Sequence, residues 1–467
     1  MKDYNIFAAP LAFLSVQKIQ MKEEINEHGV MTITGFIADE EEKNYMQRLL
    51  AGDVWEMVEK VGMDGEREVL FWGIITDFAI DSEYHQKQMT LTIASGSWLL
   101  DQEKHFRTFQ DSAVTYEDIF RQITAGYADA EVRFNSPMTD AEGKLILQYY
   151  ETDWQFLKRL ASRKHKFLVA ESRINGGRFS FNLPKGQRAE MPETGKYAVI
   201  KELGEYRRKK NGGLTELREE DALIYAVTDR ENHRIGDYMT IQGRTLYIYK
   251  IESSLVSGEM LHECYLKSEA GMEVLETKHA EITGAALDGI VKKVKEDQVQ
   301  TIILGDENGQ QDINIWYPYA TVYSTSDGTG WYCMPEPGDR VRLAIPGGEE
   351  KEAFVISSVH METDSADRKD PDVKSFKSKY QKEVRFTPDS IVITNNQGTK
   401  IELTDAEGIH IVSAHSVMLE AAEDMTILSD TGSLIVAGTS SVNLQQGGTA
   451  INMDKGITFT GGELKVQ

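Results

Sequence analysis

The sequence predicts a mainly β fold that ends in a repetitive needle, and three observations indicate it. From residue 386 to 467, pairs of apolar residues recur, each flanking one variable residue, with a period of eight or nine residues over the middle of the stretch. Alternating runs fill residues 1–100 and 215–275, and about five shorter runs fill residues 285–360. Because strand side chains alternate between two faces, each run predicts a strand with one buried face. We therefore expect two β-barrels with inserted helices, an OB-fold barrel and a C-terminal β-helix.

The length of the chain sets the expected number of domains. At about 100–200 residues per domain, 467 residues predict three or so domains. Shifts in pattern place the boundaries: a double-barrel domain over 1–282, an OB-fold domain over 283–362, a charged and polar linker over 363–385, and the β-helix over 386–467.

Charge and cysteine content restrict the class of partner and the compartment. The chain has 51 Lys and Arg against 75 Asp and Glu, a formal net charge of −24. Phosphate binding needs a basic surface, so we expect no nucleic-acid partner. Cys264 and Cys333 lie far apart in the sequence, and we expect two reduced thiols rather than a disulfide framework.

The N-terminus has no apolar core of a signal peptide, and no apolar run approaches the roughly 20 residues of a membrane helix. We therefore expect assembly in the cytoplasm, with any export depending on something other than a signal peptide.

The first barrel is indicated by three alternating runs, at residues 30–37, 69–80 and 88–94. Long strands with polar connections are typical of an antiparallel barrel. Two helices follow, near 115–125 and 152–165. Thr115 is the expected N-cap of the first, and Thr152 with Gln155 has the capping-box form at the start of the second.

Strands return after residue 166, and Gly176-Gly177 predicts a hairpin turn between two of them. A second barrel-like run covers 215–275. The five strands expected in the OB-fold barrel are 287–294, 300–304, 313–323, 340–345 and 352–360, and five strands in some 75 residues suit this fold.

The C-terminal repeat is too short for a one-chain solenoid, because about eight residues cover only one side of a prism. Three chains that each supply one side would close the needle without free strand edges, so we predict a trimeric, triple-stranded β-helix. Its predicted apolar core consists of Ile391, Ile393, Ile401, Leu403, Ile409, Ile411, Val417, Leu419, Met425, Ile427, Leu434, Val436, Val442, Leu444, Ile451, Met453, Ile457 and Phe459, with Leu464 and Val466 as a tenth pair.

Residues that suggest chemistry are better explained by structure. His262, Glu263 and Cys264 are consecutive in a predicted strand and so point to opposite faces, which does not suit a metal site. His410 is expected to be a solvent-facing residue, with an axial metal or anion site as the minor alternative. The acidic residues of the repeat lack the cleft that a glycosidase pair needs. We find no hydrolase, phosphate-loop or zinc-protease motif, and expect no catalytic residue, cofactor or metal.

Two motifs and the repeat carry a resemblance to a known family. Phe106-Arg107-Thr108-Phe109-Gln110, followed by the stretch Gln148–Leu160, resembles the hub signature of VgrG proteins and of related hub and spike proteins of phage tails, tailocins and other contractile injection systems. The stretch Gly330–Val341 is similar to the "P-x-x-G-D-x-V" strand of the spike OB domain. The order of hub, OB barrel and β-helix is also that of the family.

The resemblance implies a structural, non-enzymatic homotrimer whose hub barrels form a pseudo-six-fold ring that caps the inner tube, with a spike that pierces the target envelope. It implies an inner tube protein and baseplate proteins as partners at the hub, and a PAAR-type tip protein and an effector at the C-terminus. We expect no effector domain after Gln467, and no iron-bound tip, since no His-x-His pair lies near the C-terminus. The tip is expected to be capped by a separate PAAR-type protein or left plain.

Two other functions are open to the same repeat. A cell-wall hydrolase would use it as a stalk, but the sequence offers no catalytic pair. A secreted carbohydrate-binding protein would show a signal peptide and exposed aromatic residues on the repeat, where only Phe386 and Phe459 are aromatic.

Overall fold

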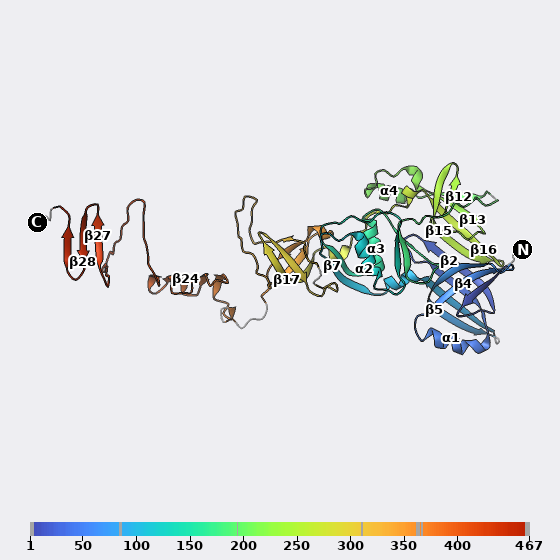
Figure 1. Ribbon diagram of the computed structural model, residues 1–467, viewed down its shortest axis with the longest axis horizontal. Helices are drawn as coiled ribbons and strands as arrows, with labels where there is room; N and C mark the ends of the chain where they lie inside the picture. Colours follow the sequence, from blue (N-terminus) through green and yellow to red (C-terminus); the bar gives the residue numbers. More distant parts are fainter. Residues whose placement is uncertain are drawn as a thin grey trace. The chain divides into compact units, whose positions relative to one another are not determined.

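The computed structural model describes residues 4–83, 86–193, 195–309, 312–360, 365 and 368–462. β-Strands predominate, and the chain divides into two compact units, Met1–Met361 and Glu362–Gln467 (Figure 1). No helix among the described residues is both long and apolar enough to cross a membrane.

An antiparallel eleven-stranded sheet forms the first part of the chain, in the order β1-β4-β5-β6-β3-β2-β15-β16-β13-β12 with β14 paired to β15. Its strands are β1 (Tyr4–Ala9), β2 (Ser15–Glu24), β3 (Val30–Ile37), β4 (Trp55–Gly62), β5 (Arg67–Glu83), β6 (Gln86–Ser95), β12 (Tyr197–Lys201), β13 (Leu223–Asp229), β14 (Tyr238–Ile241), β15 (Arg244–Val256) and β16 (Glu259–Lys267). The two predicted barrels are therefore two halves of one sheet, joined where β2 pairs with β15 (Figure 1).

Each half of the sheet has its own hydrophobic core. Ile33 and Leu91 lie in the first core, and Ile248 and Leu266 lie in the second, all four without solvent exposure. Three helices border the halves: α1 (Glu42–Leu49) follows β3, while α4 (Leu203–Asn211) and α5 (Glu269–Met272) belong to the second half. The alternation along each strand is what allows one face to be buried in this way.

A buried carboxyl group lies within the first half. Glu56 on β4 has no solvent exposure, and both of its oxygens accept a hydrogen bond from the Leu11 amide, at 3.2 and 3.1 Å. Burial raises the pKa of Glu56 to about 8, since desolvation disfavours the charged form, and the Leu11 hydrogen bond offsets only part of this effect. The group is therefore largely protonated in the folded protein at neutral pH.

We predict that Glu56→Gln removes a pH dependence of stability. The folded-state pKa of Glu56 lies above the value of 4.5 for a free glutamate, so its contribution is complete below pH 4.5 and is lost as the pH rises through about 8. Thermal unfolding followed at several pH values should show the wild type losing at least about 1.4 kcal/mol relative to the glutamine variant, the equivalent of one pKa unit. Parallel pH profiles for the two proteins would contradict this.

The region between the two halves contributes a helical layer. It contains α2 (Tyr116–Thr124) and α3 (Asp153–Ser162), a strand pair, and a three-stranded sheet in the order β10-β11-β8. The strands are β7 (Lys104–Phe109), β9 (Ile146–Thr152), β8 (Glu131–Phe134), β10 (Leu168–Ala170) and β11 (Arg178–Phe181).

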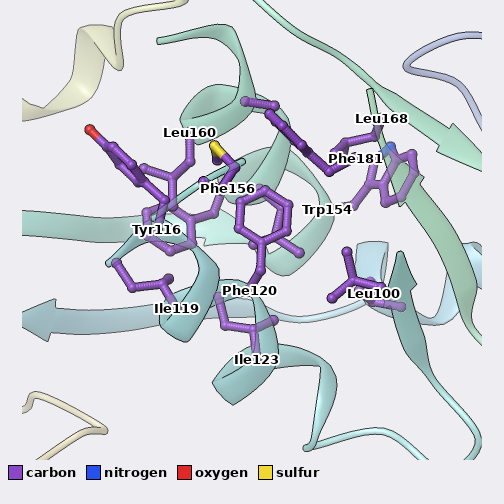
Figure 2. Packing of buried hydrophobic residues seen from close by; sticks show 14 of the residues in the cluster. Leu100, Tyr116, Ile119, Phe120, Ile123, Trp154, Phe156, Leu160, Leu168 and Phe181 are labelled. Carbon is purple, nitrogen blue, oxygen red and sulfur yellow. The ribbon is translucent and has the colours of Figure 1, made fainter. Parts of the chain in front are cut away.

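Capping boxes start both helices of this layer. The Thr115 side chain accepts a hydrogen bond from the Asp118 amide at 3.1 Å, and that of Thr152 accepts one from the Gln155 amide at 3.2 Å. The predicted caps are thus confirmed. Figure 2 shows the helices turning Phe120, Phe156 and Trp154 toward a shared core, and each of these three residues is at most 2% exposed.

A five-stranded barrel follows, in the order β19-β18-β17-β20-β21, with β17 (Ala285–Lys295), β18 (Gln298–Ile303), β19 (Tyr317–Pro318), β20 (Arg340–Ile345) and β21 (Phe354–Ile356). A parallel bridge between Tyr319 and Val355 links its two end strands. The strand predicted over 313–323 is reduced to β19, because the amides of Asn314 and Ile315 donate to the carbonyl of Gln110 instead of to a strand.

The second unit consists of two antiparallel meanders. The first runs through β22 (Lys374–Lys377), β23 (Glu383–Phe386), β24 (Ser390–Thr394), β25 (Lys400–Thr404) and β26 (Gly408–Val412); the second runs through β27 (Val442–Gln446), β28 (Thr449–Met453) and β29 (Ile457–Thr460).

Two expectations for this unit differ from the structure. The linker predicted over 363–385 is shorter, because β22 and β23 pair with each other and β23 pairs with β24. Residues 413–441, all of which the structure describes, contain no strand. The apolar pairs continue through this segment with the same spacing. Within one chain, however, no neighbouring strand is present to form backbone hydrogen bonds with the segment.

Candidate functional site

The hub signature forms a buried polar network around Asp153, the first residue of α3. Its carboxylate is 1% exposed and accepts three hydrogen bonds, from Arg107 at 2.6 Å, from Gln148 at 2.8 Å and from the Tyr127 hydroxyl at 2.8 Å. Burial and the neighbouring Asp153 carboxylate raise the pKa of Tyr127. With three donors, the hydrogen-bonding capacity of this buried carboxylate is satisfied. Because Arg107 lies on β7 and Gln148 on β9, these hydrogen bonds fix the start of α3 relative to both strands.

A second part of the network connects α3 to the OB-fold barrel. Arg159 is 4% exposed; it donates to the Glu151 carboxylate, to the carbonyl of Leu147 at 2.6 Å and to the Glu350 carboxylate at 2.8 Å. Glu350, itself 5% exposed, also pairs with Arg163 at 2.6 Å. Glu350 precedes β21, so two cations near the end of α3 hold the barrel through one carboxylate.

The edge of β7 is held by the loop after β18. The Thr108 amide donates to Asp306 at 2.9 Å, and the Phe106 amide donates to Glu307 at 2.9 Å. Burial alone would raise the pKa of Glu307. The pKa is nevertheless lowered, because Glu307 accepts hydrogen bonds from the Phe106 amide and from His105, and because the positive charge of Arg107 lies nearby. Glu307 is therefore ionised at neutral pH and available as an acceptor along this edge.

Apolar contacts complete the junction. Phe106, Leu145 and Leu147 from the hub region are part of the buried core of the OB-fold barrel. The Tyr317 hydroxyl on β19 donates to the Gln110 side chain at 3.0 Å. The motif that carries the sequence resemblance therefore joins the hub region to the barrel. Its partners Asp306, Glu307 and Glu350 were not identified from sequence.

Those predicted core residues of the needle that lie in the two meanders gather on one face of each meander. In the first meander, the register places Ile391, Leu403 and Ile409 side by side. In the same way it aligns Ile393, Ile401 and Ile411. These six side chains are 39–68% exposed in the single chain. We call them the apolar face of the first meander.

The second meander repeats this arrangement. Its register aligns Val442, Met453 and Ile457 in one row, and Leu444, Ile451 and Phe459 in the other. Ile457 and Phe459 are 65% and 56% exposed.

Six of the predicted core residues lie outside the meanders. They fall in the strand-free segment 413–441 and are not brought together within one chain; all are exposed: Val417, Leu419, Met425, Ile427, Leu434 and Val436. Leu464 and Val466 lie outside the described residues.

The opposite face of the first meander is mainly polar. Val392 is aligned with Glu402, and Glu402 with His410. Each of these residues lies between two residues of the apolar face along its strand, so its side chain points to the opposite side of the sheet. A soluble monomer rarely exposes a contiguous apolar surface of this kind, and such a surface marks an interaction site. The geometry therefore suits burial of one face of each meander by other chains.

The residues considered for metal chemistry have structural surroundings. The His262 ring is 1% exposed and contacts the Ser253 hydroxyl at 2.7 Å, and burial lowers the pKa of His262 to about 4. Cys264 is a buried free thiol on the same strand, and Cys333 is an exposed one. His410 is half-exposed, 3.8 Å from Glu407. Within the described part of the chain, no three His, Cys, Asp or Glu side chains form a group that could hold a metal ion.

Comparison with known proteins gives two family matches. Residues 46–210 match the phage tail baseplate hub (GPD) family, and residues 287–360 match the OB domain of type VI secretion system and phage-baseplate injectors. No curated protein matches the sequence.

Solved structures share the fold at low sequence identity. The Escherichia coli c3393 protein, described as a component of the type VI secretion system with structural similarity to the T4 tail proteins gp27 and gp5, is 13% identical, with a TM-score of 0.52 over 75% of this chain and 99% of its own. The half-lidded Francisella PdpA-VgrG complex is 10% identical, with a TM-score of 0.56 over 87% of each chain.

The OB-domain match begins and ends close to the five-stranded barrel, and the hub match covers the signature residues around Asp153 and Arg159. Along the chain, a region similar to phage tail baseplate hubs therefore precedes a region similar to the injector OB domain, and the fold is that of these solved hub and VgrG structures.

Proposed function

We propose that this protein is the trimeric hub and spike of a contractile injection apparatus. The observation that carries the proposal is the combination of a hub domain and an injector OB domain with a C-terminal unit whose apolar face is exposed in the single chain. Three copies that turn these faces inward would bury them and form a rod. Burial of one large aliphatic side chain contributes about 1.5–3 kcal/mol, so the rod gains stability from each layer.

The function of such a rod is mechanical rather than catalytic. Contraction of a sheath drives the tube, and a narrow spike at its front concentrates the force on a small area of the target envelope. The matched families are baseplate and injector domains, which supports a structural role. Neither the family matches nor the solved structures described above support the hydrolase or the carbohydrate-binding function.

The partners follow from this role. The hub would contact the inner tube protein and baseplate proteins, and the far end of the rod would carry a PAAR-type tip protein. The PdpA-VgrG complex of Francisella supports a further cargo protein bound to the spike. Assembly would take place in the cytoplasm, followed by outward delivery on contraction.

We predict that the full chain sediments as a trimer at micromolar concentration. Deletion of residues 386–467 should weaken trimerisation, because it removes the apolar face, and should abolish the assembly of functional particles. A full-length monomer with an intact repeat would refute the trimer, and normal injection by the truncated protein would refute the role as a spike.

A further inference from the structure

The OB-fold barrel carries a projecting hairpin between β19 and β20, which we call the arm, residues 321–332. Ser324 and Gly330 pair in an antiparallel bridge, and the Trp331 amide donates to the Tyr323 carbonyl at 2.8 Å. At the tip, the Thr325 amide donates to the Thr329 carbonyl at 2.9 Å. The arm is therefore a formed hairpin.

Hydrogen bonds also fasten the root of the arm. The Thr321 hydroxyl donates to the Trp331 carbonyl at 2.8 Å. The Tyr332 hydroxyl donates to the carbonyl of Glu296, in the turn between β17 and β18, at 3.0 Å. This fixed shape lowers the conformational entropy that the arm would lose on binding a partner.

The arm displays large apolar side chains to solvent. Val322 is 93% exposed, Tyr332 75%, Trp331 59% and Tyr323 51%. Trp and Tyr are enriched among the residues that dominate binding energy at protein interfaces. In a chain of net charge −24, the arm has a single charged residue, Asp327, so little repulsion opposes its approach to another copy.

A pocket that suits the arm lies on the same barrel. It has a volume of about 450 Å³, and most of its lining is apolar: Leu145, Ile315, Trp316, Pro318, Tyr319 and Phe354. Its charged lining residues are Lys144, Glu350, Lys351 and Glu352; of these, Glu350 pairs with Arg159 and Arg163, and Lys351 pairs with Glu349. The exposure of the arm side chains shows that the arm does not fill the pocket of its own chain.

One charged residue of the pocket, Lys144, can pair with the arm. Lys144 lines the pocket and forms no ion pair with the residues that the structure describes. Hydrogen bonds from Thr325 and Thr329 lower the pKa of Asp327, so the carboxylate at the tip of the arm is ionised. An ionised Asp327 can therefore approach Lys144 while the aromatic residues enter the apolar pocket.

We propose that the arm of one copy docks in the OB-barrel pocket of a neighbouring copy, with Asp327 directed to Lys144. This inference rests on the proposed trimer. Because arm and pocket are different surfaces, the contact joins copies head to tail, and three such contacts close a ring. The OB barrels would then supply a second contact between the three chains, in addition to the contact of the C-terminal meanders.

Cross-linking between two differently tagged, full-length copies tests this contact. One copy carries Asp327→Cys and the other Lys144→Cys, both with Cys333→Ser, so that any product of the two engineered thiols joins two chains. With a flexible bismaleimide we expect a covalent pair that contains both tags on a denaturing gel. The matched control replaces Lys144→Cys by Lys43→Cys on exposed α1, and should give no pair.

Sedimentation of Trp331→Ala provides a second readout. The variant should weaken the trimer by about tenfold or more, as loss of a central interface Trp commonly does, whereas Ser326→Ala at the tip should not. If the two engineered thiols give no cross-linked pair and Trp331→Ala leaves the trimer unchanged, the arm contact is overturned and the proposed function still stands. A monomeric wild type would overturn both.

Discussion

Replacement of Arg159 by Met is expected to destabilise the first unit by about 3–5 kcal/mol, because it leaves the buried Glu151 carboxylate without its arginine and removes one of the two cations on Glu350. Arg159 pairs with Glu151 and with Glu350, and all three side chains are less than a tenth exposed. The loss should appear as a lower midpoint of thermal or denaturant unfolding. It should also loosen the OB barrel from the hub, since Glu350 belongs to the barrel.

The control for this variant is an ion pair at the surface. Arg230 donates to Glu259 at 2.9 Å, but its side chain is 73% exposed, so Arg230→Met should cost at most about 1 kcal/mol. Adding Glu151→Gln to Arg159→Met should recover part of the stability, because a neutral amide replaces the carboxylate that has lost its arginine. Equal losses for Arg159→Met and Arg230→Met would refute the importance of the buried network.

The sequence predicts well those features that depend on neighbouring residues. Thr152 and Gln155 lie three positions apart, so the capping box they form is visible in the sequence. The alternation of Ile401 and Leu403 likewise predicts a strand with one apolar face, because strand geometry alone determines which side chains share a face.

Features that depend on distant residues were missed. Arg159 and Glu350 are separated by 191 positions, and no local pattern relates a cation on a helix to a carboxylate near a later strand. The short strands β22 and β23 were assigned to a linker, since each contains few apolar residues and is formed through its pairing partner. Conversely, Leu434 and Val436 have the alternation of a strand but lie in a segment without one. Alternation marks a strand only where another strand is available to complete its hydrogen bonds.

This dependence on a partner gives the second large effect: Ile411→Asp should convert the proposed trimer to monomers at micromolar concentration. Ile411 lies on the apolar face of β26 and is 56% exposed in the single chain, so the substitution costs the isolated chain little. In the trimer it would bury three carboxylates and remove three aliphatic contacts, each worth about 1.5–3 kcal/mol. Sedimentation of the full-length variant measures the result.

The neighbouring residue supplies a matched control. His410 precedes Ile411 on the same strand, but it pairs with Glu402 on the mainly polar face. His410→Asp introduces the same carboxylate one position away, and it should leave the trimer intact because that side chain stays in water. If both variants dissociate, negative charge rather than burial controls assembly. If both remain trimeric, the apolar face does not line the contact between chains, and the trimer must be held elsewhere, with the arm of the OB barrel as the remaining candidate.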